Sequence, residues 1–105
     1  MFGDLFGDME AKQKALRAKL AEIEVEAEAG GNAVRVVANA NREIVNLKID
    51  EDLLASQDGE QIEDLLMVAI NRALSKAAER EATESQALLR DMLPPGLQGM
   101  GDLFG

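Results

Sequence analysis

Apolar residues near the start of the chain recur at helical spacing. Leu5, Met9, Leu16 and Leu20 fall on one face of a helix with about 3.6 residues per turn, and good helix formers lie between them. The pattern predicts a helix over residues 4–21 with a narrow apolar stripe.

The period then falls to two, which is typical of strands with one buried face. Glutamates alternate with apolar residues over residues 22–29, so the glutamates share one face. The segment Gly30-Gly31-Asn32 predicts a tight turn, because these residues tolerate a positive φ. Further strands are predicted over residues 33–40 and 43–49, with a turn at residues 39–42. Together the three strands make an antiparallel meander.

A long helix is predicted after a short helical turn or loop at residues 50–54. Asp58 has the position of an N-cap, and Gln61 follows three residues later in a capping-box arrangement. The apolar stripe of the helix suits packing on the sheet and consists of Ile62, Leu65, Leu66, Ala69, Ile70, Ala73, Leu74 and Ala77. Beyond residue 78 the stripe weakens, so the helix is predicted to extend past its sheet before Pro94-Pro95-Gly96 ends it.

The composition is acidic and fits one domain. Among 105 residues, 20 Asp and Glu against 11 Lys and Arg give a formal net charge of −9. We assign residues 1–96 to a single domain of α+β class and α-β-β-β-α order, and residues 97–105 to a flexible Gly-rich tail. The core is aliphatic and rich in alanine, hence thin, and dimerisation would stabilise it.

The location expected from the sequence is cytoplasmic. No stretch approaches the ~20 uncharged apolar residues of a membrane span. The N-terminus also lacks the basic region and apolar run of a signal peptide.

Composition also restricts the chemistry of the chain. It contains no histidine and no cysteine, which excludes imidazole catalysis, thiolate chemistry and the commonest zinc ligands. The serines have no histidine to activate them. The acidic residues form a row along a strand and a dispersed cluster, whereas hard cations need oxygens that converge on a point. We therefore predict that the protein is not an enzyme and has no cofactor and no metal site.

The basic residues fall into two groups. One group lies in the first helix, with no acidic residue between Glu10 and Glu22, and comprises Lys12, Lys14, Arg17 and Lys19. The other is spaced at i, i+4 and i+8 on the long helix and comprises Arg72, Lys76 and Arg80. Both groups are also compatible with cations that pair with nearby carboxylates or lie along a packed interface.

The pentapeptide Gly-Asp-Leu-Phe-Gly occurs twice, at residues 3–7 and 101–105. We favour chance recurrence in two terminal segments, because five residues carry little specificity. The alternative is a pair of docking peptides for one shared groove.

Several short segments occur in a characteristic order and cover nearly the whole chain. They are Met1-Phe2-Gly3, the Lys- and Gln-rich first helix, Gly30-Gly31, Val34-Arg35-Val36, the sequence from Val45 to Leu54, Asn71 with Ala73, and Leu93-Pro94-Pro95-Gly96. In this order and spacing the sequence resembles the YbaB/EbfC family of bacterial nucleoid-associated proteins.

The resemblance implies a tweezer-like homodimer, in which long helices project from a joined sheet, and binding of duplex DNA in the nucleoid. The candidate DNA-binding residues are the basic ones of the two helices: Lys12, Lys14, Arg17, Lys19, Arg72, Lys76 and Arg80. We place part of the dimer contact at Ala69, Ala73 and Ala77, since small side chains allow two helices to approach closely.

Contacts to DNA are expected through phosphates and shape. The chain has no helix-turn-helix pattern and no aromatic residues placed to stack on bases, so specific base readout is not predicted. The alternative function is that of an acidic dimeric scaffold, which binds an unknown protein partner and has little affinity for DNA. Charge reversal at Arg72, Lys76 and Arg80 would distinguish the two functions, because it should abolish DNA binding and need not affect a protein partner.

Overall fold

The computed structural model describes residues 2–93. Residue 1 and residues 94–105 lie outside the described residues, and with them the predicted helix stop, the predicted tail and the second copy of the pentapeptide. The elements are α1 (Phe2–Glu22), β1 (Glu24–Ala29), β2 (Val34–Asn39), β3 (Ile44–Ile49), α2 (Glu51–Ala55) and α3 (Gly59–Met92). None of the helices in residues 2–93 is long and apolar enough to cross a membrane.

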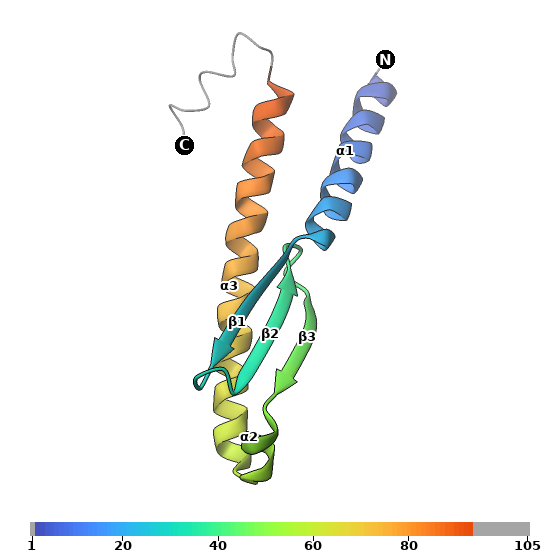
Figure 1. The fold of residues 1–105 in the computed structure, drawn as a ribbon. Coiled ribbons are helices and arrows are strands. Elements are labelled where there is room, and N and C mark those ends of the chain that lie inside the picture. The colour runs from blue at the N-terminus through green and yellow to red at the C-terminus, as the bar shows by residue number, and fades with distance from the viewer. Residues whose placement is uncertain (1, 94–105) are drawn as a thin grey trace.

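The strands form one antiparallel sheet in the order β1-β2-β3 (Figure 1). The predicted α+β class and the meander are thereby confirmed. The turn between β1 and β2 has positive φ angles of 66°, 63° and 74° at Gly30, Gly31 and Asn32, as these residue types predict.

The transition from α1 to β1 lies later than the sequence predicted. The Ile23 N–H bonds to the Leu20 carbonyl at 3.2 Å, and the chain remains helical through Glu22. Glu22 is therefore not part of the strand. The glutamate row on the outer face of the sheet consists of Glu24, Glu26 and Glu28.

α3 packs on the face of the sheet formed by β1 and β2. Its N-cap is Asp58, whose carboxylate accepts the Gln61 N–H at 3.1 Å, as predicted. The fully buried residues of α3 are alanines, so the helix lies close to the strands. The buried core consists of Ala27, Ala29, Val34, Val36, Ala38, Leu53, Ala69, Ala73 and Ala77. β3 lies beside this contact, and its side chains are exposed or half-buried.

α3 is much longer than the strands on which it packs. Its 34 residues span about 51 Å, whereas a strand of 6 residues spans about 20 Å. The C-terminal half of α3 and the whole of α1 therefore project beyond the same end of the sheet as two arms (Figure 1). The radius of gyration is 19.1 Å, against about 13 Å for a compact domain of this length.

The turn between β2 and β3 holds the base of the α1 arm. The Ala40 N–H bonds to the carbonyls of Leu20 and Ile23 at 3.1 and 2.9 Å. The side-chain amide of Asn41 donates to the Arg17 carbonyl at 3.0 Å. The last turn of α1 is thereby fixed to the sheet.

Candidate functional site

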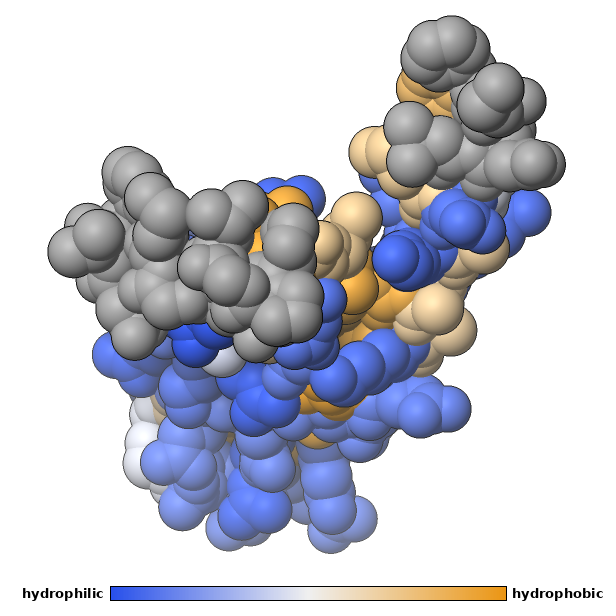
Figure 2. Space-filling model, turned by 90° about the horizontal axis from the view of Figure 1, so that it is seen from above, coloured by the Kyte–Doolittle hydropathy of each residue, from blue (hydrophilic) through white to orange (hydrophobic). Residues whose placement is uncertain are grey.

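The two arms enclose a groove. Figure 2 looks down on the arms and shows apolar surface between them. The groove has a volume of about 190 Å³ and is lined by Lys12, Ala15, Leu16 and Lys19 of α1 and by Glu84, Ala87, Leu88 and Asp91 of α3. Its lining thus combines apolar side chains with cations from α1 and carboxylates from α3.

Glu84 joins the two arms. Its carboxylate lies 3.0 Å from the Lys19 ammonium and 3.6 Å from the Arg80 guanidinium, and its side chain is 16% exposed. The hydrogen bond from Lys19, together with the positive charges of Lys19 and Arg80, holds the pKa of Glu84 below its ordinary value. Lys19 and Arg80 are therefore engaged within the chain.

Lys12, Lys14 and Arg17 are exposed on α1. Among the described side chains, those of residues 6–93, no carboxylate forms an ion pair with any of the three. They lie in a stretch of α1 that has no acidic residue, on a chain that is acidic overall. This arm presents the unpaired cations that binding of a phosphate backbone requires.

Arg72 and Lys76 lie beside β1 and not on the arms. The Arg72 guanidinium donates to the Glu28 carbonyl at 2.9 Å, and the Lys76 ammonium donates to the Glu26 carbonyl at 2.7 Å. The basic ridge predicted on the long helix is therefore divided between the sheet edge and, at Arg80, the carboxylate of Glu84.

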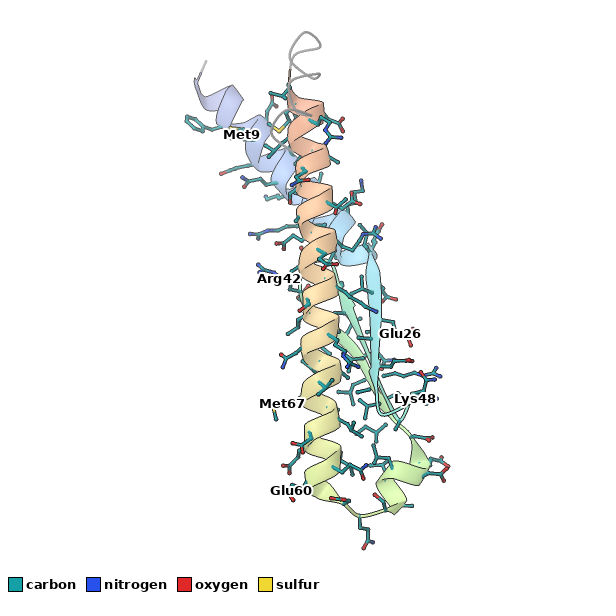
Figure 3. The ribbon with its side chains drawn as sticks, turned by 90° about the vertical axis from the view of Figure 1, so that its left-hand side faces the viewer. Met9, Glu26, Arg42, Lys48, Glu60 and Met67 are labelled. Atoms are coloured by element: carbon teal, nitrogen blue, oxygen red, sulfur yellow. The ribbon has the colours of Figure 1, made fainter. Side chains whose placement is uncertain are left out.

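The outer face of the sheet carries charges of both signs. Glu26 and Lys48 lie on the side of the sheet away from α3 (Figure 3). The strand register places Arg35 opposite Glu28 on one side, which is a pair of opposite charges, and opposite Lys48 on the other, which is a pair of like charges. In the described part of the chain, no three acidic side chains converge as a metal site requires.

A model of the YbaB/EbfC DNA-binding family matches residues 3–92. The chain belongs to this family. A nucleoid-associated protein of Finegoldia magna is 42% identical over 78 residues, which are 74% of this chain and 69% of that protein. A nucleoid-associated protein of Rhodopseudomonas palustris is 40% identical over 94 residues, 89% of this chain and 88% of that protein. The resemblance inferred from the sequence is thus confirmed.

The fold of this YbaB/EbfC family member also has a solved counterpart. The crystal structure of an uncharacterized protein from Helicobacter pylori matches it with a TM-score of 0.72 and 28% sequence identity. The match covers 84% of this chain and 92% of the other. The helix, three-stranded sheet and long final helix are therefore shared between them.

The alanines that we assigned to a dimer contact lie inside the YbaB/EbfC protomer. Ala69, Ala73 and Ala77 are all 0% exposed and belong to the core that α3 forms with the sheet. Their small side chains let α3 lie close to the sheet. Because this contact buries them completely, they offer no surface to a second chain. Exposed apolar residues lie elsewhere, on the helices and on β3, where Ile44 is 40% and Leu47 is 39% exposed.

Sequence reasoning gave no role to Asn39, which organises the turn at the base of the α1 arm. Its side chain is 5% exposed and accepts the backbone N–H groups of Asn41 and Glu43 at 2.9 and 3.2 Å. It also donates to the Glu43 carboxylate at 2.9 Å. The asparagines of the turn were a sequence signal for the role of Asn39. The bonds from this turn to α1 could not be predicted, because they join segments that are distant in the sequence.

Proposed function

We propose that this protein binds duplex DNA through phosphate contacts from the α1 arms of a homodimer and acts in organising the nucleoid. The observation that carries the proposal is the group of exposed, unpaired cations on a projecting helix: Lys12, Lys14 and Arg17. Membership of a DNA-binding family supports DNA as the polyanion. Phosphate contacts release counterions whatever the base sequence, so we expect little sequence preference.

The proposed contact set is smaller than the one named from the sequence. Lys19 and Arg80 are paired with Glu84, and Arg72 and Lys76 donate to backbone carbonyls. A phosphate would have to displace these partners before it could bind. We therefore assign the main contacts to the three unpaired cations of α1.

We propose that β3 provides the dimer contact. β3 is an edge of the sheet, and Ile44, Val45 and Leu47 are 40%, 47% and 39% exposed. An apolar edge strand of this kind is a template for pairing with a second chain. A small alanine-rich core also benefits from the extra burial. A two-fold axis would bring the β3 edges of two copies together and join their sheets.

The charge of the molecule makes binding sensitive to salt. Each chain carries −9, so two chains carry twice that charge. The positive potential near the arms extends only about one Debye length, ~10 Å at 0.1 M salt, and the rest of the molecule is acidic. Affinity is therefore expected to be high only at low ionic strength.

A matched pair of double variants tests the proposal. Lys14→Gln/Arg17→Gln removes two charges from the arm, and Arg35→Gln/Arg42→Gln removes two from β2 and the turn that follows it, outside α1 and β3. In fluorescence anisotropy with a labelled duplex, we expect the arm variant to lose about tenfold or more in affinity, about 1.4 kcal/mol. The control variant should lose less than about threefold. Equal losses would mean that net charge alone matters and that α1 does not contact DNA.

A further inference from the structure

The two edges of the sheet are chemically unlike. β1 and β3 are both edge strands, and an edge strand has backbone N–H and C=O groups that lack a neighbouring strand. At β1, two carbonyls are occupied by side chains of α3. In residues 2–93, no side chain donates a hydrogen bond to the backbone of β3. One edge is thus covered and the other open.

The two occupied carbonyls are those of Glu26 and Glu28, which alternate along β1. Alternate residues of an antiparallel edge strand direct their carbonyls away from the neighbouring strand, where a further strand would bind them. Arg72 reaches Glu28 at 2.9 Å and Lys76 reaches Glu26 at 2.7 Å. The side chains therefore occupy the acceptors that an added strand would need.

The spacing of helix and strand explains why two such bonds form. Four residues of a helix advance about 6 Å, and two residues of a strand advance about 6.7 Å. α3 runs opposite to β1 (Figure 1), so the earlier cation meets the later carbonyl. One turn of α3 thus matches one repeat of the strand. The next cation, Arg80, leaves this series and pairs with Glu84.

We propose that Arg72 and Lys76 close the β1 edge, so that the sheet can be extended only at β3. The inference rests on the proposed homodimer. If both edges were open, β1 of one chain could pair with β3 of the next, and assembly would continue without limit. With β1 closed, pairing of β3 with β3 produces a dimer that has no remaining free edge. Pairing of β1 with β1 is opposed independently by the glutamates on both copies.

The test removes the donors and keeps the aliphatic length of the side chains. Arg72→Met/Lys76→Met is compared with wild type and with Arg35→Met/Arg90→Met, which makes a similar charge and polarity change at exposed positions outside both edge strands. Mass is measured by light scattering over a range of protein concentrations. We expect wild type and the control variant at twice 11.3 kDa, and the edge variant at larger masses that rise with concentration.

A second variant separates loss of the edge bonds from general damage to the fold. Arg72→Lys/Lys76→Arg keeps a donor at each position and is expected to remain a dimer. An edge variant that stays a dimer at every concentration would overturn the proposal, and so would assembly of the donor-keeping variant. A monomeric wild type would instead refute the proposed dimer.

DNA affinity distinguishes closure of the β1 edge by Arg72 and Lys76 from a direct contact of these residues with DNA. If Arg72 and Lys76 close the edge, the binding of a labelled duplex by the dimeric fraction of Arg72→Met/Lys76→Met should stay within threefold of wild type. A loss of tenfold or more, with the mass unchanged, would assign these residues to DNA contact and overturn the proposal.

Discussion

Asn39→Ala tests the turn that holds the α1 arm. The substitution removes three hydrogen bonds of a side chain that is 5% exposed: those from the Asn41 and Glu43 N–H groups and the one to the Glu43 carboxylate. At about 1 kcal/mol for each bond, the expected loss of unfolding free energy is about 3 kcal/mol. This is a large share of the roughly 5–15 kcal/mol typical of a domain.

The assay is urea unfolding followed by far-UV circular dichroism at one fixed protein concentration, because the proposed dimerisation would contribute to stability. With a slope of about 1.5 kcal/mol per molar urea, the midpoint should fall by about 2 M and the slope should not change. Gln86→Ala, at an exposed position on α3 outside the proposed dimer strand, is the control and should shift the midpoint by less than about 0.3 M. Equal, small shifts for both variants would refute the role given to Asn39.

Three further substitutions test local features of the fold and of the arms. Gly30→Ala and Gly31→Ala both place a Cβ at positive φ, but only at Gly30 does that Cβ come within 2.9 Å of the Leu65 side chain. In urea unfolding, Gly31→Ala should therefore lower the free energy of unfolding by about 1 kcal/mol, and Gly30→Ala should lower it measurably more. Equal costs would remove the contact with Leu65 from the explanation. The pKa of Glu84 is lowered in the folded state, so its ionised carboxylate stabilises the fold. This stabilisation is complete well above the ordinary glutamate pKa of about 4.3 and is lost as pH falls through and below that value. The stability difference between wild type and Glu84→Gln should therefore shrink from pH 6 to pH 3, and a difference that does not change with pH would contradict the ion pairs with Lys19 and Arg80.

Features governed by neighbouring residues could be predicted from the sequence. The positive φ angles at Gly30 and Gly31, the N-cap at Asp58 and the meander all follow from local chemistry and from the period of the apolar pattern. The extension of α3 past the sheet was also visible, because charged residues return to its apolar face.

Features that depend on distant contacts could not be predicted. From the sequence, the alanine stripe was assigned both to packing on the sheet and to part of a dimer contact, and only the packing of α3 on β1 and β2 shows that Ala73 is fully buried within one chain. The bonds of Arg72 and Lys76 join residues that are 44 and 50 positions apart. Spacing on the helix indicated a basic ridge but gave no indication of the carbonyls beneath it. For the same reason, the cations of α1 could be named in advance, whereas their freedom from ion pairs could not.

The salt dependence of duplex binding tests the central claim most directly. A plot of log K against log salt concentration should be linear, with a slope of about −0.9 for each phosphate neutralised. Lys14→Gln/Arg17→Gln removes two cations from each chain, so the slope for the dimer should become shallower by as much as about 3.6. Absence of binding at low salt, or the same slope for the variant and wild type, would contradict DNA binding through the α1 arms.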